Sequence, residues 1–243
     1  MRNVLVTGSS RGIGAETVRL FAKNGDNVFI NYNHSENYAN ALFNELKSDG
    51  YSVNIIKADI SSSDEIKKMF KKIQNSCKGI DVLVNNAGIA QTKLFTDITN
   101  DDWDRMIATN LSSAFYCCRC ALPYMIHNHF GRIINLSSMW GQVGGSCEVH
   151  YSATKAGIIG LTKALAAEEG LSGITVNCVA PGVIKTDMTS NLSESDFEVL
   201  KDETPTGTIG TPYDVARTVL FLADNNSSFI TGQVFGVNGG FVV

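Results

Sequence analysis

The sequence predicts a single-domain α/β protein: a doubly wound sheet of about seven parallel strands with helices on both faces. Short apolar runs alternate with helical patterns along the 243 residues, and this alternation is typical of a parallel sheet. No proline-rich, serine-rich or like-charged stretch divides the chain. Because 44% of the residues are hydrophobic, one sizeable core can form. We therefore predict one domain over residues 1–243.

Seven runs rich in apolar or β-branched residues are the expected strands. They are Val4–Thr7, Asn27–Asn31, Val53–Ala58, Ile80–Val84, Gly131–Leu136, Ile174–Val179 and Gln233–Val237. Two long helical patterns, about Asp101–His127 and Tyr151–Gly170, lie on either side of the fifth run. Residues 187–210 are polar and lack a strand pattern, so we expect a mobile helical lid there, with a surface insertion as the alternative.

A glycine-rich turn joins the first expected strand to the first helix. Strand, glycine turn and helix together present backbone N–H groups and the positive end of a helix to a phosphate. Glycines also let a pyrophosphate come close to the backbone. A tight turn without a ligand is the alternative, but the position after the first strand favours dinucleotide binding. The expected contact residues are Gly8, Ser10, Arg11, Gly12, Ile13 and Gly14.

The end of the second expected strand indicates which dinucleotide binds. In dinucleotide-binding folds an acid there commonly holds the ribose 2′-hydroxyl, whereas a 2′-phosphate needs a cation. Here the strand ends in Asn31, and no acid occurs before Glu36. Arg11 is available to a 2′-phosphate, although it could equally be a solvated loop residue. We therefore expect NADP(H) rather than NAD(H), with Asn31 among the contact residues.

Further candidate contact residues follow the third and fourth expected strands. Asp59, with Ile60 beside it, either contacts the adenine or caps a turn, two equally weighted roles. Asn86, Ala87 and Gly88 follow the fourth strand. Ligands of open parallel sheets bind beyond the carboxyl ends of the strands. The sequence therefore brings these residues and the glycine turn to one edge of the sheet.

A tyrosine and a lysine four residues apart, Tyr151 and Lys155, are the candidate catalytic pair. On a helix they share one face, which brings an ammonium near a phenol and lowers the phenol pKa from about 10 toward the operating pH. Ser138 precedes Tyr151 and can hold a carbonyl oxygen beside the phenol. The three groups suit reversible proton transfer to a carbonyl or alcohol oxygen, although such a pair also occurs by chance in many helices.

Several neighbouring residues are weaker candidates for the active site. Asn110 falls in the middle of a long helical pattern and marks either a kink or a water site. His150 adjoins Tyr151 but is expected to face elsewhere, since consecutive helical residues point in different directions. Glu148 either lines the pocket or covers it.

Composition argues against several other classes of protein. The net charge is −4, and Lys67, Lys68, Lys71 and Lys72 have the spacing of a solvated helix face, so nucleic-acid binding is not expected. Neither a signal peptide nor a membrane span is expected, which indicates a cytoplasmic protein without a membrane partner. The six cysteines fit reduced thiols. Cys117 and Cys120 form a C-x-x-C without a second ligand pair, so we expect core packing and no metal site.

With these motifs in place, the chain resembles the short-chain dehydrogenase/reductase family, which has a Rossmann-like fold. The motifs that carry the resemblance are Thr7 to Gly14, Asp59, Asn85 to Gly88, Asn110, Ser138, Tyr151 with Lys155, and Pro181-Gly182. The resemblance implies hydride transfer between a nicotinamide and a carbonyl/alcohol pair. It implies that Tyr151 protonates the oxygen, Ser138 positions it, and Lys155 lowers the tyrosine pKa and binds the nicotinamide ribose.

The same resemblance implies three further roles. Asn110 would support a proton relay through water. The segment from Pro181 through Gly182 and Ile184 to Thr186 would line the nicotinamide pocket. The two long helices would build a homotetramer.

Within the family, the chain is most similar to bacterial 3-oxoacyl-[acyl-carrier-protein] reductases, in the runs 131–135, 173–177 and 186–189. Such enzymes are expected to carry basic residues before the first two runs to dock the acidic carrier protein. Here those positions hold His127–Phe130 and Glu168–Ser172. From the resemblance we predict an NADPH-dependent reductase of 3-oxoacyl thioesters. Because the basic positions are not kept, the carrier of the thioester is either acyl carrier protein or CoA. A family dehydrogenase of a sugar, polyol or other secondary alcohol, and a dinucleotide sensor without catalysis, are the alternatives.

Overall fold

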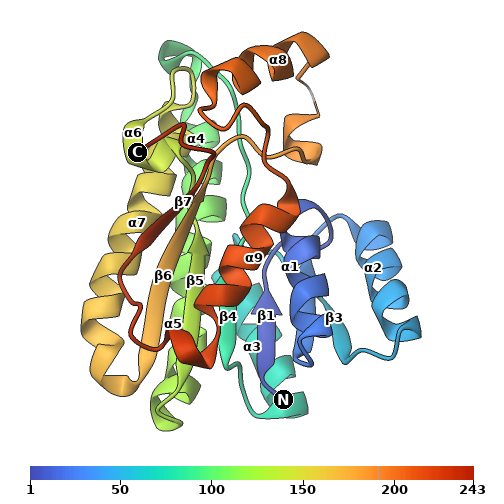
Figure 1. The fold of residues 1–243 in the computed structure, drawn as a ribbon. Coiled ribbons are helices and arrows are strands. Elements are labelled where there is room, and N and C mark those ends of the chain that lie inside the picture. The colour runs from blue at the N-terminus through green and yellow to red at the C-terminus, as the bar shows by residue number, and fades with distance from the viewer. Residues whose placement is uncertain (191) are drawn as a thin grey trace.

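The computed structural model describes residues 1–190 and 192–243, and its centre is one sheet of seven parallel strands (Figure 1). The strand order is β3-β2-β1-β4-β5-β6-β7, and every pairing is parallel. The strands are β1 (Asn3–Val6), β2 (Asn27–Tyr32), β3 (Val53–Lys57), β4 (Val82–Asn85), β5 (Gly131–Leu136), β6 (Ile174–Pro181) and β7 (Val234–Val237). All seven predicted strands are confirmed, with ends within two residues of those expected.

Helices cover both faces of the sheet, as predicted (Figure 1). Helices α1 (Gly12–Lys23), α2 (Glu36–Ser48) and α9 (Pro212–Leu222) pack on one face, and α3 (Ser63–Cys77), α5 (Ser113–His127) and α7 (Val149–Glu169) pack on the other. Alternate residues of a strand pack into the hydrophobic cores on opposite faces of the sheet. Val4 and Val6 lie in the core under α1, α2 and α9, and Leu5 lies in the core under α3, α5 and α7. Because successive side chains of a strand point to opposite faces and both faces are covered, the central strands are buried along nearly their whole length.

The order of the strands determines where a ligand fits. From β1 the chain moves outward to β2 and β3, then returns to the other side of β1 to form β4. Ligands of open parallel sheets bind outside the carboxyl ends of the strands at such a reversal of strand order, here β1 and β4. The glycine turn after β1 and Asn86 after β4 both lie there, as predicted.

The long helical pattern expected over 101–127 is interrupted. It consists of α4 (Asn100–Ile107), a π-helical turn (Ala108–Ser112) and α5. Asn110 lies inside the π turn, so the irregularity expected at this asparagine is present. Insertion of one extra residue into a helix at such a turn is frequent at functional sites.

The predicted lid is helical, as expected. A 3₁₀ turn (Asp187–Thr189) leads to α8 (Glu194–Glu203), and Asn191 between them lies outside the described residues. Ile184 forms a single parallel bridge with Gly210, which closes the lid segment at its base. The mobility of the lid stays a prediction.

The cysteines and lysines fall where the sequence placed them. Cys117 is buried and Cys120 half-buried in the core under α5, and burial raises the pKa of both thiols. The four lysines of α3 are all exposed. In the part of the chain that the structure describes, no three His, Cys, Asp or Glu side chains gather as metal ligands do. No helix of residues 1–190 or 192–243 has the length and apolarity to cross a bilayer.

Candidate active site

The glycine turn packs against the loop that follows β4. A β-carbon built on Gly8, whose φ is +59°, would lie 2.8 Å from Ala87 Cα, and one built on Gly14 would lie 2.6 Å from Asn86 Nδ2. Asn86 Nδ2 donates to the carbonyls of Thr7 (2.9 Å) and Gly8 (3.1 Å). A side chain does not fit at position 8, where the backbone of Ala87 lies against the turn, or at position 14, where Asn86 Nδ2 and the backbone of Gly8 and Ser9 lie against it. Asn86 therefore shapes the turn from the neighbouring strand.

The start of α1 is suited to an anion. Its N-cap residue, Arg11, makes no side-chain capping bond, and the first turn holds no acid, within the residues that the structure describes. The first-turn N–H groups of a helix need partners, and its positive end favours a negative charge. A pyrophosphate meets both requirements, so these residues fit a dinucleotide.

Asn31 has a structural task that the sequence did not reveal. Its side chain is 1% exposed; Oδ1 accepts from the Gly8 N–H (3.1 Å), and Nδ2 donates to the Ala58 carbonyl (3.2 Å) and, at 3.4 Å, to that of Ile56. Both ends of the amide are thus occupied inside the protein. Asn31 holds the glycine turn onto β2 and β3, and its expected contact with the cofactor remains untested.

Asp59 adopts the second of its two predicted roles. Its Oδ1 accepts from the backbone N–H (2.9 Å) and hydroxyl (2.7 Å) of Ser61, which makes a capped turn after β3. Burial opposes ionisation, but the hydrogen bonds from Ser61 outweigh it and lower the pKa of Asp59. Ile60 is buried in the core against α3. An adenine contact by Asp59 or Ile60 stays a prediction.

The segment 181–187, which follows from the end of β6, approaches the glycine turn. A β-carbon built on Gly12 would lie 3.6 Å from Thr186 Cγ2, and Arg11 Nη1 lies 3.6 Å from Asp187 Oδ2. The lid segment and the glycine turn are therefore neighbours. Pro181 accepts from the Met139 N–H (2.9 Å), and Ile184 is buried.

The four candidate catalytic residues come from three different elements. Ser138 follows β5, Tyr151 and Lys155 lie on α7, and Asn110 lies in the π turn. Lys155 Nζ is 5.6 Å from the centre of the Tyr151 ring, and Ser138 lies near enough to the Tyr151 phenol to lower its pKa. A β-carbon built on Gly88 would lie 3.3 Å from Asn110 Oδ1 and 3.5 Å from Lys155 Nζ. Folding thus gathers all four beside the loop after β4.

The electrostatics of the pair differ from the sequence prediction. Burial raises the pKa of Tyr151 to about 12; the nearby Ser138 opposes this rise and the charge of Glu148 adds to it. Burial also lowers the pKa of Lys155 to about 8. Lys155 Nζ donates to the Leu136 carbonyl (2.8 Å) rather than to the phenol. In this structure desolvation of the phenol dominates the pKa of Tyr151, and the lowering of that pKa by Lys155 stays a prediction.

Asn110 anchors the loop after Gly88. Its Oδ1 accepts from the Ile89 N–H (2.8 Å), and its Nδ2 donates to the Ile89 carbonyl (2.9 Å) and to Thr154 Oγ1 (3.3 Å). The amide is occupied by these contacts and is buried. Support of a water relay by Asn110 stays a prediction.

A set of residues that sequence reasoning did not find ties this region together. His150 is buried and faces Gln91, as expected of a neighbour that points away from the pocket. Gln91 and Lys93 both contact Asp102 at the start of α4. No local pattern marks these residues, since they come from separate segments and meet only in the fold.

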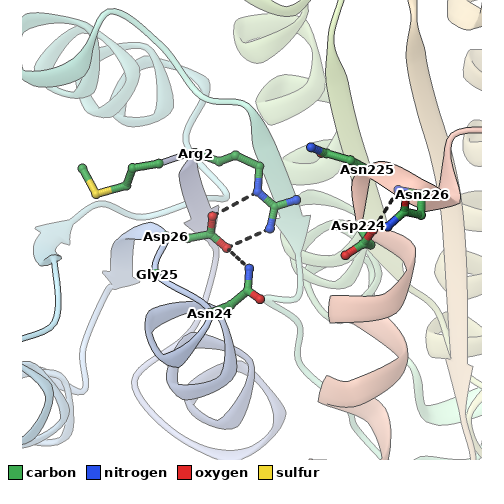
Figure 2. A pocket seen from close by; sticks show the side chains of 8 residues that line it. Arg2, Asn24, Gly25, Asp26, Asp224, Asn225 and Asn226 are labelled. Carbon is green, nitrogen blue, oxygen red and sulfur yellow. Dashed lines mark hydrogen bonds and ion pairs between the residues drawn. The ribbon is translucent and has the colours of Figure 1, made fainter.

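The opposite edge of the sheet carries an open cavity of about 360 Å³ that is unrelated to this site (Figure 2). It lies beside the amino ends of β1 and β2. Arg2 and Asp26 there form an ion pair with 2.8 Å between Nη2 and Oδ2. The third charged side chain of this cavity, Asp224, accepts from the Asn226 N–H (2.7 Å), and none of the candidate catalytic residues lines the cavity.

Comparisons with known proteins agree with the geometry. A family model described as "Enoyl-(Acyl carrier protein) reductase" matches residues 8–242. The 3-oxoacyl-[acyl-carrier-protein] reductase FabG of Staphylococcus aureus (strain Mu50 / ATCC 700699) is 44% identical over 239 residues, which cover 98% of this chain and 97% of that protein. The chain belongs to the short-chain dehydrogenase/reductase family.

Other relatives show how widely chemistry varies on this fold. The (2S)-[(R)-hydroxy(phenyl)methyl]succinyl-CoA dehydrogenase subunit BbsD of Thauera aromatica is 42% identical over 240 residues, covering 98% of this chain and 96% of that protein. A crystal structure of a putative gluconate dehydrogenase from Agrobacterium tumefaciens superposes with a TM-score of 0.96 at 33% identity, covering 100% of this chain and 97% of that one. The fold and family are thus shared by proteins with different substrates.

Proposed function

We propose that the protein is an NADPH-dependent oxidoreductase that reduces a 3-oxoacyl thioester to the 3-hydroxyacyl thioester. One observation carries this proposal. Ser138, Tyr151 and Lys155 lie together on the side of the sheet where the glycine turn presents a helix N-terminus suited to an anion. The 3-oxoacyl reductases at 41–44% identity support the substrate class. The bound nicotinamide would supply the hydride, and the protein would supply orientation and the proton.

The geometry supports a division of roles among the three residues. With a pKa raised to about 12, Tyr151 stays protonated at neutral pH and holds the proton that the substrate oxygen must receive. Ser138, whose hydroxyl lies near the phenol, positions that oxygen. Lys155, with a pKa of about 8, is mostly cationic at neutral pH and favours the phenolate left after proton transfer. Lys155 therefore supplies a positive charge near the phenol oxygen, where negative charge develops during reduction.

NADP(H) is the proposed form of the cofactor. Arg11 is half-exposed at the glycine turn, and β2 ends without an acid. Asp187 pairs with Arg11 at 3.6 Å, but both groups are more than half exposed, so this pair is weak and a 2′-phosphate can displace it.

Apolar residues at the carboxyl edge fit an acyl substrate. Leu94 and Phe95 before α4, Val143 in α6 (Trp140–Val143) and Met188 in the lid turn are exposed. The lid helix α8 carries five acids and one lysine, which does not attract an acidic carrier. Acyl carrier protein and CoA both remain proposed carriers.

Two further proposals concern assembly and location. Small side chains at Ala153, Ala156, Gly160 and Ala164 line an exposed stripe of α7, and Phe115 is exposed on α5. Such faces suit helix packing between subunits, which supports a homotetramer. We place the protein in the cytoplasm.

The test follows oxidation of NADPH and, separately, NADH by the purified protein with acetoacetyl-CoA. We expect NADPH to be oxidised in preference. Tyr151→Phe removes the proton donor, so turnover should fall by at least about 100-fold, while NADPH binding measured by fluorescence persists. Tyr38→Phe, the same change at a 58% exposed position on α2, should keep full activity.

Two results would contradict the proposal. Turnover retained by Tyr151→Phe would exclude the phenol as proton donor. Binding of NADPH without reduction of any 3-oxoacyl thioester would transfer the proposal to a sugar or alcohol substrate, which the same assay run in the oxidative direction would identify.

A further inference from the structure

His150, the residue before Tyr151, is fully buried and faces away from the pocket. Its Nε2 lies 2.9 Å from Gln91 Oε1, on the loop that leaves Gly88. Gln91 Nε2 lies 3.1 Å from Asp102 Oδ1 at the start of α4. The side chains thus form a chain of hydrogen bonds from the first turn of α7, across the loop, to α4.

The chemistry of this chain determines the tautomer of His150. A carboxylate only accepts hydrogen bonds, so Gln91 turns its NH₂ group toward Asp102 and its carbonyl oxygen toward His150. His150 Nε2 must then carry the proton and donate. Burial lowers the pKa of His150, although Asp102 opposes this effect; Lys93 and Arg105 lower it further. A neutral imidazole with the proton on Nε2 follows.

Asp102, at the far end of this series of hydrogen bonds, is an ionised carboxylate that only accepts hydrogen bonds. Its Oδ2 accepts from Lys93 Nζ (2.6 Å) and from the N–H (3.1 Å) and hydroxyl (2.8 Å) of Thr99. The bond from Lys93, and then those from Thr99, hold the pKa of Asp102 well below its usual value. A second tie runs in parallel, because the Lys93 N–H donates to the Cys147 carbonyl at 2.7 Å.

We propose that His150 is a positioning residue: its Nε2–H bond to Gln91 holds the first turn of α7, and with it Tyr151, at a set distance from the loop after Gly88. That loop starts at Gly88, which lies against Asn110 and Lys155, so the distance between the loop and the α7 turn affects where Tyr151 lies among the candidate catalytic residues. The inference deepens the proposed function, on which it rests, since it names what orients the proton donor of the same site.

The test compares variants that remove the His150–Gln91 hydrogen bond, called the link below, with one that restores it. His150→Leu keeps volume but removes the donor, and kcat should fall about tenfold, the loss expected from one hydrogen bond. KM for NADPH should stay unchanged because the glycine turn is remote from the link. His150→Gln, which restores an NH donor, should recover most of kcat. Gln74→Leu on the exposed face of α3 is the matched control for Gln91→Leu.

A double-mutant cycle separates positioning from general damage. The losses in His150→Leu and Gln91→Leu should not add in the double variant, because each breaks the same link. Additive losses, or a folded His150→Leu protein with wild-type kcat, would overturn the inference. If His150→Leu fails to fold, Gln91→Leu serves instead, because it removes the acceptor of the same hydrogen bond, and the same fall in kcat is expected against the Gln74→Leu control.

One measurement does not depend on catalytic activity. It tests the His150–Gln91 hydrogen bond even if the proposed function is wrong, so the two failures can be told apart. Side-chain ¹⁵N NMR of the wild-type protein reports which ring nitrogen of His150 carries the proton. We expect the proton on Nε2, slow to exchange in the wild type and fast in Gln91→Leu. A proton on Nδ1 would refute the link whatever the substrate proves to be.

Discussion

Asn31→Asp distinguishes the two interpretations of the end of β2. From the dinucleotide pattern, an acid at this position should favour NADH. In the structure, however, Asn31 is buried and holds the glycine turn. The substitution is nearly isosteric, so its effect reports on hydrogen bonding and charge rather than on packing.

The magnitude follows from the contacts that change. The acceptor for the Gly8 N–H survives, but both donated bonds, to Ala58 and Ile56, are lost. Two carbonyls then face a buried carboxylate, which should cost about 2–3 kcal/mol of unfolding free energy. For a chain of this size that corresponds to a fall in Tm of about 4–12 °C.

The assay is thermal unfolding together with NADPH and NADH titration, with Asn40→Asp on the exposed face of α2 as control. We expect the variant to bind both dinucleotides more weakly by similar factors. Burial raises the pKa of the new carboxyl above its unfolded value, so the deficit should shrink as the pH falls and the group is protonated. A variant as stable as the control that gains affinity for NADH would refute this reasoning.

Two other substitutions test the site. Glu148→Gln removes a charge that raises the pKa of Tyr151, so the alkaline limb of the kcat/KM profile for reduction should move to lower pH; an unchanged limb would exclude this coupling. Gly14→Ala inserts a β-carbon 2.6 Å from Asn86 Nδ2 and 2.7 Å from Ser9 Cα, so dinucleotide affinity and Tm should both fall. Gly170→Ala, at an exposed position after the end of α7 with no atom within 4 Å, is the control; equal Tm values for the two variants would contradict the close approach.

The sequence by itself determined the fold, the family and the segments that carry the site. Alternating apolar runs and helical patterns specify strands and helices locally, and parallel strands bring their carboxyl ends to one edge. The glycine spacing and the four-residue step from Tyr151 to Lys155 are local signals, so the order of residues alone reveals both motifs. The capped turn at Asp59 and the irregular helix at Asn110 are also predictable, because the tendencies of Asp and Asn are local.

Only the tertiary structure decided what these side chains touch. Asn31 faces inward because residues of β3 and the glycine turn, distant in sequence, complete its hydrogen bonds. The phenol of Tyr151 becomes a weaker acid because the assembled elements exclude water, an effect that the spacing to Lys155 does not contain. His150, Gln91 and Asp102 come from three segments without a shared motif. Burial and long-range hydrogen bonds depend on the whole packed chain, whereas turns, helices and strands depend on neighbours in sequence.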